Sequence, residues 1–134
     1  MKNVLNWSIL CILLFLYACN SNDKVQRKLL YGTWVSTNYF EDGTIIIDKT
    51  CFNSSGTFVD IGKIISNSTT NNFVGTASWD IVNGYLEFQV INCEPEVLPI
   101  GYTGKDKILF LDSDKYCFSS SAGDYSYTAY KFND

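Results

Sequence analysis

The amino-acid sequence predicts an all-β fold: a small antiparallel up-and-down β-barrel of eight or nine short strands, preceded by a short N-terminal helical turn. Aromatic residues make up 16% of the 134 residues, and only two residues are proline. Aromatic and β-branched side chains suit the pleated, half-buried surface of a strand. Turn residues separate short runs of such side chains, and Asn83-Gly84 between two apolar runs is a strong hairpin signal. Closure into a barrel removes the two exposed edges that an open sheet would keep.

The helical turn is expected over Lys24–Leu30, with Asp23 as its N-terminal cap. Nine candidate strands follow, and no longer helix fits between them. The turn sequences Glu41-Asp42-Gly43 and Asn53-Ser54-Ser55-Gly56 end the first two strands. The first five candidate strands are Tyr31–Phe40, Thr44–Phe52, Thr57–Ile65, Phe73–Val82 and Tyr85–Cys93.

Two segments interrupt this series. The polar segment Ser66–Asn72 is expected to be a mobile loop, and Pro95 and Pro99 mark an irregular connection. The remaining candidate strands are Ile100–Thr103, Lys107–Leu111, Lys115–Ser119 and Tyr125–Phe132.

Apolar and polar residues alternate with a period of two in these segments, which indicates an antiparallel sheet with one face on a single core. In the fifth strand, for example, apolar residues alternate with Glu87 and Gln89. For the two candidate tryptophans a core position is favoured over a ligand wall, because side chains fill most of the interior of a small barrel. The candidate core or barrel-lining residues are Trp34, Trp79, Phe73, Leu86, Phe88 and Val90.

The N-terminal segment has the layout of a secretory signal, with Lys2, an apolar stretch over Val4–Phe15, and Ala18 before Cys19. It is too short to span a bilayer, which takes about 20 residues of helix. The sequence Leu16-Tyr17-Ala18-Cys19 resembles the lipobox of bacterial lipoproteins, although Tyr17 is bulkier than the residue usual there. The alternative is an ordinary signal peptide with Cys19 as a structural thiol.

The lipobox resemblance implies three segments: a signal peptide over residues 1–18, a polar tether over residues 19–30 that begins with lipidated Cys19, and a β-barrel domain over residues 31–134. Several acyl chains on Cys19 give stable anchoring, which one chain does not. Asn20, in place of the aspartate that retains such lipoproteins in the inner membrane, implies the outer membrane of a bacterial cell envelope.

A second resemblance concerns the barrel. The sequence Leu30-Tyr31-Gly32-Thr33-Trp34 resembles the Gly-x-Trp motif at the start of lipocalins, and this resemblance implies that Trp34 plugs the barrel floor beneath a short helix. The segments 52–58 and 75–86 resemble those of small bacterial lipocalin-like lipoprotein domains. The likeness covers about residues 30–88, and the later residues match only as generic strands.

The composition excludes several classes of function. Removal of residues 1–18 takes away Lys2, so the 10 basic residues fall to 9 against 14 acidic ones, a balance of −5, and no cationic surface for nucleic acid is expected. The chain has no histidine, which removes the commonest general base and metal ligand. The acidic pairs at 41–42, 94–96 and 112–114 are interpreted as solvated turns rather than as catalytic carboxylates or calcium ligands. Neither a metal nor another cofactor is expected.

Three cysteines remain after the signal and Cys19, namely Cys51, Cys93 and Cys117, and none has Cys-x-x-Cys spacing. One disulfide and one free thiol is the simplest arrangement in an oxidising compartment, with three pairings open. Alternation of nine strands places Cys93 and Cys117 at the same rim, so this pair is favoured.

These observations favour a non-enzymatic envelope lipoprotein whose barrel binds a small apolar or amphipathic ligand or a protein partner. A domain of only about 104 residues leaves room for a small cavity at most. The alternative is a protein-binding inhibitor or immunity factor against an envelope-active hydrolase or toxin, with Ser66–Asn72 or Glu94–Pro99 as its inserting loop. Its acidic charge would suit a basic hydrolase. A third possibility is an accessory subunit of an envelope complex.

Overall fold

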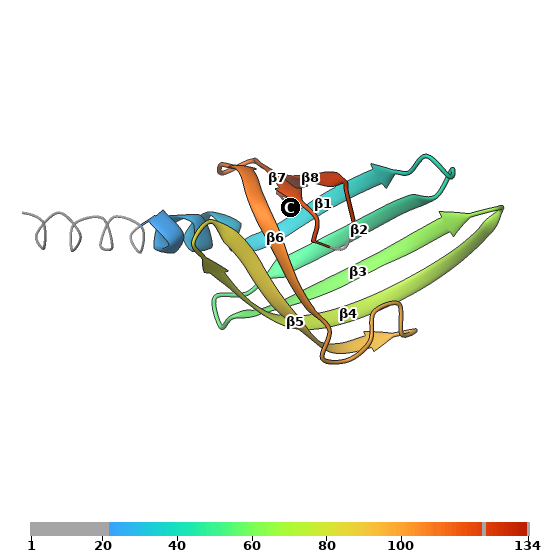
Figure 1. Ribbon diagram of the computed structural model, residues 1–134, viewed down its shortest axis with the longest axis horizontal. Coiled ribbons are helices and arrows are strands. Elements are labelled where there is room, and N and C mark those ends of the chain that lie inside the picture. The colour runs from blue at the N-terminus through green and yellow to red at the C-terminus, as the bar shows by residue number, and fades with distance from the viewer. Residues whose placement is uncertain (1–21, 122, 134) are drawn as a thin grey trace, which may run out of the picture.

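Eight antiparallel strands follow one helix and close into a barrel in the computed structural model, which describes residues 22–121 and 123–133 (Figure 1). Each strand pairs with its neighbours in sequence, and β1 pairs with β8 to close the sheet. The fold class predicted from the sequence is therefore confirmed, with eight strands. The helix covers residues 22–30, and the strands are β1 Gly32–Tyr39, β2 Ile45–Phe52, β3 Thr57–Ser66, β4 Thr69–Val82, β5 Tyr85–Glu94, β6 Thr103–Leu111, β7 Lys115–Ser119 and β8 Ser126–Lys131.

The expected mobile loop Ser66–Asn72 is a prediction that the structure corrects. Only Asn67 and Ser68 lie outside β3 and β4, and both have positive φ, 48° and 66°. This is the backbone of a tight two-residue hairpin turn, which Asn tolerates because its side chain forms local hydrogen bonds. The β3–β4 hairpin extends to the end of the molecule opposite the helix (Figure 1).

The expected strand Ile100–Thr103 is also wrong. Residues 95–102 form a loop, and β6 begins only at Thr103. Within this loop Gly101 has a φ of 85°, its N–H donates to the Val90 carbonyl (2.8 Å), and the Val90 N–H donates to the Tyr102 carbonyl (2.9 Å). The short apolar run is thus folded back on β5 by a turn at Gly101, where a left-handed conformation costs glycine little.

The helix closes one end of the barrel. Leu30 and Trp34 are completely buried there, and the Trp34 Nε1 donates to the Leu30 carbonyl at 2.7 Å. The Trp34 ring lies 4.9 Å from the Tyr116 ring, and the Lys131 ammonium lies 4.3 Å from the Trp34 ring centroid. We call this end the floor. Its buried residues are Leu30, Trp34, Phe52, Trp79, Ile81, Leu86, Tyr116, Phe118 and Ala129.

Residues 22–30 are fastened to the floor, so this part of the predicted tether belongs to the folded unit. Asp23 is not the N-terminal cap as expected, because residue 22 is already helical and Asp23 lies within the helix. Its carboxylate accepts hydrogen bonds from the N–H groups of Asn83 (2.8 Å) and Gly84 (3.1 Å) in the β4–β5 turn. Arg27 pairs with Asp80 and lies 4.6 Å from the Trp79 ring centroid. Within residues 22–121 and 123–133, no helix has both the length and the apolar character needed to cross a membrane.

The variant Asp23→Ala tests this fastening. We expect it to lower the free energy of unfolding by about 1 kcal/mol, because two hydrogen bonds to a carboxylate are lost at a partly exposed site. Urea denaturation followed by tryptophan fluorescence measures the change. The neighbouring exposed variant Lys24→Ala is the matched control and should leave the midpoint unchanged. Equal midpoints for both variants would contradict a role of Asp23 in holding the helix.

Candidate functional site

The interior of the barrel holds a cavity of about 320 Å³ between the floor and the opposite end. We call that opposite end the mouth, and loop residues Phe40, Val97, Leu98 and Tyr125 contribute to the cavity wall there. The rest of the wall is formed by inward-facing strand residues. Apolar members of that wall are Phe58, Ile64, Phe73, Leu86, Phe88 and Val90.

The six candidate core or lining residues divide into two groups. Phe73, Leu86, Phe88 and Val90 line the cavity. Trp34 and Trp79 belong to the buried cluster of the floor, and the Trp79 Nε1 donates to the Thr57 carbonyl at 3.0 Å. The two tryptophans are therefore core residues, as the sequence favoured.

The cavity exists because two phenylalanine rings lie against glycines in the barrel wall. A β-carbon at Gly104 would lie 2.2 Å from Cζ of Phe88, its partner on β5, and one at Gly62 would lie 2.6 Å from Cζ of Phe73, its partner on β4. Each ring thus occupies the space that a side chain on the neighbouring strand would take. The rings cover the wall, and the centre of the barrel stays open.

Three aspartates lie in the wall of this cavity: Asp48 on β2, Asp60 on β3 and Asp106 on β6. Ser36 donates to Asp48, and the Thr50 hydroxyl donates to Asp60 at 3.1 Å. Among the described residues that line the cavity, none is lysine or arginine. The interior is therefore largely apolar and carries three acidic groups in its wall, a combination that the alternation in the sequence did not predict.

Burial raises the pKa values of both Asp48 and Asp60. The pKa of Asp60 rises to about 7, first through burial and second through the negative charge of Asp48. Asp48 and Asp60 are diagonal neighbours across β2 and β3, because Asp48 pairs with Gly62 and Thr50 with Asp60. Carboxylates at such short range disfavour each other's ionisation.

Asp106 is buried and hydrogen-bonded on both oxygens. Its Oδ1 accepts from the Ser121 N–H (2.8 Å) and Oγ (2.9 Å), and its Oδ2 accepts from the Tyr127 hydroxyl (2.6 Å). Burial and the charge of Asp106 raise the pKa of Tyr127 well above its ordinary value, so Tyr127 stays a neutral donor. This network fixes Asp106 as a positioned acceptor in the wall.

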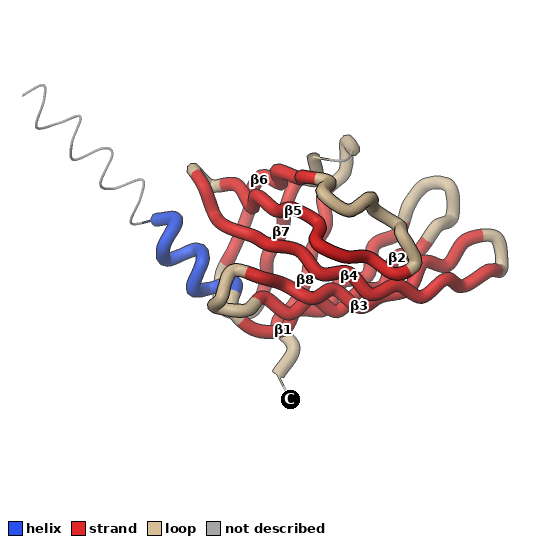
Figure 2. Tube along the Cα trace, turned by 90° about the horizontal axis from the view of Figure 1, so that it is seen from below, coloured by secondary structure: helices blue, strands red, loops and turns tan. Residues whose placement is uncertain are grey.

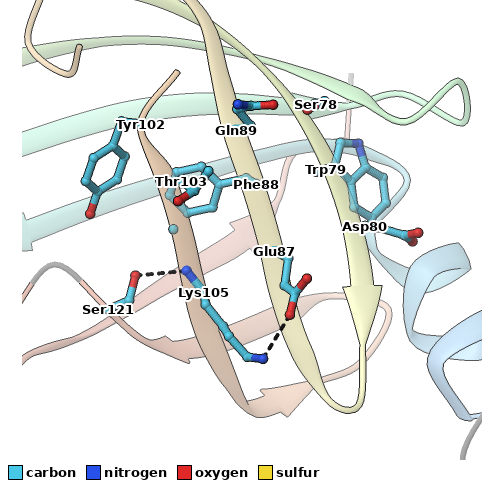
Figure 3. Close-up of a pocket in the computed structure, with 11 residues that line it drawn as sticks. Ser78, Trp79, Asp80, Glu87, Phe88, Gln89, Tyr102, Thr103, Lys105 and Ser121 are labelled. Atoms are coloured by element: carbon cyan, nitrogen blue, oxygen red, sulfur yellow. Dashed lines mark hydrogen bonds and ion pairs between the residues drawn. The ribbon is translucent and has the colours of Figure 1, made fainter. Parts of the chain in front are cut away.

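A second hollow lies outside the barrel, over the outer face of β4, β5 and β6 (Figure 3). Its charged side chains have partners, since Lys105 Nζ lies 2.9 Å from Glu87 Oε1 and Asp80 pairs with Arg27. Ligand sites are concave and mostly apolar, with a few convergent polar groups. The interior cavity matches that description, whereas the outer groove is an open surface with paired charges.

The predicted disulfide between Cys93 and Cys117 does not form, and Cys51, Cys93 and Cys117 are free thiols. Because β6 lies between them, β5 and β7 run in the same direction. Cys93 lies near the end of β5, whereas Cys117 is the central residue of β7 and pairs with Phe110 near the end of β6. Cys93 is buried and lines the cavity, whereas Cys117 alternates with the buried residues Tyr116 and Phe118 and so points outward. The two thiols differ in height and in the face they occupy.

The acidic segment at 112–114 forms the hydrogen-bonded turn that its sequence predicts, whereas Glu94 of the 94–96 pair is the last residue of β5. Asp112 accepts hydrogen bonds from the N–H groups of Asp114 and Lys115, both at 2.8 Å, and these bonds lower its pKa. No group of three histidine, cysteine or acidic side chains in the described residues is placed to hold a metal ion. Cys19, the predicted lipidation site, lies outside the described residues.

No family model and no curated protein sequence matches this chain. Similar solved structures are designed β-barrels. A redesigned beta barrel, mFAP1, bound to DFHBI, has 17% sequence identity and a TM-score of 0.46, with 80% of this chain and 98% of that chain covered. EF1p2_mFAP2b bound to DFHBI has 15% identity and a TM-score of 0.49, with 80% and 97% covered. At these values the comparison concerns the barrel shape, and it assigns no ligand to this cavity.

Proposed function

We propose that this protein is a non-enzymatic, lipid-anchored envelope lipoprotein of the lipocalin-like kind that binds a small amphipathic molecule inside its barrel. The observation that carries the proposal is the interior cavity, whose wall is largely apolar and holds three aspartates. Its volume of about 320 Å³ lies near the lower end of the roughly 300–1,000 Å³ of small-molecule sites. A ligand with a short apolar body and one polar group would match a largely apolar wall that carries a few polar groups.

The position of the helix supports a defined orientation on the membrane. The described part of the helix, residues 22–30, lies at the floor, opposite the β3–β4 turn (Figure 2). A lipid on Cys19 would be attached only three residues before residue 22, the first described residue of this helix. The floor would then face the bilayer, and the mouth would open away from the anchoring membrane.

The variant Gly75→Leu tests the proposed function by filling the cavity. A β-carbon at Gly75 meets its nearest neighbours at 3.8 and 3.9 Å, so a larger side chain enters the cavity without a clash at its root. We expect the purified full chain to retain a small molecule from a bacterial lipid extract in native mass spectrometry. Retention by Gly75→Leu should fall at least tenfold.

The adjacent variant Val74→Leu is the matched control, because Val74 is exposed on the outer face of β4. It should retain the molecule as the wild type does. No retained molecule in the wild type, or equal retention in Gly75→Leu, would contradict binding inside the barrel.

A second candidate function is binding to a protein, as in an inhibitor or immunity factor. Exposed apolar side chains of the β5–β6 loop favour it, since Val97, Leu98 and Ile100 are 45%, 39% and 65% exposed. Ser66–Asn72, the other expected inserting loop, is a tight hairpin. Pull-down from envelope extracts with wild type and Ile100→Asp separates the two functions, because only a protein partner docked on this loop would be lost with the variant.

A further inference from the structure

The three aspartates in the cavity wall restrict the charge of the ligand, in addition to its amphipathic character. The cavity shows where a ligand lies, and the charged groups in its wall decide which ligand is tolerated. Those groups are all acidic in the described lining: Asp48, Asp60 and Asp106. Their neutral neighbours Tyr116 and Tyr127 are buried hydroxyl groups on β7 and β8.

We propose that the ligand is a cationic amphiphile, whose protonated amine lies among Asp48, Asp60 and Asp106 while its apolar chain extends toward the mouth. This inference rests on the proposed function and specifies the class of its ligand. An ammonium group offers several N–H donors and one positive charge, which are what ionised carboxylates in an apolar surrounding require.

The alternatives for the polar group fit less well. A carboxylate or phosphate head would place another negative charge beside three acidic groups, and like charges at short range repel. A metal ion would need three or more protein ligands close together, and no such group occurs in the described chain. Above about pH 7, where Asp60 is ionised, a neutral hydroxyl head would leave the repulsion between Asp48 and Asp60 unrelieved.

The raised pKa of Asp60 is consistent with an ammonium group bound beside it. Its pKa of about 7 means that a proton occupies Asp60 below about pH 7 and leaves it above that pH. A bound ammonium supplies the positive charge in place of that proton, so binding should release protons near pH 7. The charge acting on Asp60 is that of Asp48. The other titratable side chains of the cavity wall are Cys93, Tyr102, Asp106, Tyr116, Tyr125 and Tyr127, and burial keeps Tyr116 and Tyr127 neutral.

The apolar part of the wall is where the alkyl chain of the ligand would pack. Ile46, Ile64 and Phe73 line the cavity on β2, β3 and β4, and Val97 and Leu98 line it from the loop at the mouth. A short alkyl chain would lie against these side chains. The amine would therefore enter first.

Calorimetry with three probes of equal chain length tests the inference: octylamine, octanol and octanoate, each added to the purified full chain at pH 8. We expect octylamine to bind at least tenfold more tightly than octanol, and octanoate to bind most weakly. At pH 6, where Asp60 is protonated, the affinity for octylamine should fall several-fold while that for octanol stays constant.

Two isosteric variants, Asp60→Asn and Asp48→Asn, should each reduce the preference for octylamine over octanol toward unity, with octanol affinity retained as evidence of an intact cavity. Asp112→Asn, in an exposed turn, is the matched control and should keep the preference. Equal binding of octylamine and octanol by the wild type, abolished by Gly75→Leu, would overturn the cationic inference and leave the proposed function standing. Absence of binding by all three probes would count against both.

Discussion

Replacement of Trp34 by alanine is expected to lower the free energy of unfolding by about 3–5 kcal/mol, the range for truncation of large buried aromatic side chains. Trp34 has no exposed surface and lies in the floor between the helix and the cavity. The substitution removes its packing against Tyr116 and leaves the Leu30 carbonyl without its indole donor. Because a domain of this size is stable by only about 5–15 kcal/mol, the variant should be close to unfolding at 37 °C.

Urea denaturation followed by far-ultraviolet circular dichroism measures this loss. Tyr39→Ala on the same strand is the matched control, because Tyr39 is 76% exposed and its truncation should cost less than about 0.5 kcal/mol. Hydrogen exchange adds a local readout: amides of residues 22–30 should lose protection in Trp34→Ala before those of β3 and β4. A loss below about 1 kcal/mol would mean that Trp34 does not close the floor.

The sequence predicts the strands well where one face is apolar and the turn chemistry is unambiguous. Asn83-Gly84 forms the β4–β5 turn with φ values of 52° and 77°, as a two-residue hairpin requires. Lys115–Ser119 has the same bounds in the sequence prediction and in the structure. Local propensity and alternation are sufficient for such elements, because both act over a few residues.

The error at Ile100–Thr103 shows how one local mistake changes a long-range prediction. Counting that segment as a strand adds one reversal of direction between Cys93 and Cys117. With nine strands the two cysteines fall at one rim, whereas with eight they lie toward opposite ends. A disulfide predicted by counting alternating strand directions is therefore correct only if every strand between the two cysteines is predicted correctly.

The aspartates of the cavity could not be recognised from alternation because the pattern in β2 and β3 is ambiguous. Ile45, Ile46 and Ile47 place apolar side chains on both faces of β2. In β3 the polarity is inverted, since Ile61 is 55% exposed on the outside while Asp60 lines the interior. Such an inversion is unfavourable for folding alone and is typical of a functional site.

The cavity itself depends on the register between neighbouring strands. The alternation of apolar and polar residues along one strand does not determine this register. The ring of Phe88 covers Gly104 only because these residues pair across β5 and β6. A shift of the register by one residue would turn the ring to the outer face. Whether the barrel interior is filled or holds a cavity can therefore be decided only from the structure.

The second large effect is expected from Asp60→Asn, which should raise the free energy of unfolding at pH 8 by about 1–2 kcal/mol and abolish most of its pH dependence. In the folded chain the pKa of Asp60 is about 7, against an ordinary value of 3.8. Between these values the folded state holds a proton that the unfolded state has lost. The stability of the wild type should therefore fall as the pH rises from about 4 to about 7 and then stay level, because above pH 7 the carboxylate is ionised in both states.

An asparagine at position 60 keeps the shape of the aspartate and its ability to accept the Thr50 hydrogen bond, but it has no charge to bury beside Asp48. Chemical denaturation at pH 5, 6, 7 and 8 gives the slope for each protein. Asp112→Asn is the control of the same chemistry: hydrogen bonds lower the pKa of this exposed aspartate, so its replacement should leave the slope between pH 5 and 8 unchanged. A wild type whose stability does not fall over this interval would mean that the pKa of Asp60 is not raised in the folded chain, which would contradict the burial of this carboxyl group beside Asp48.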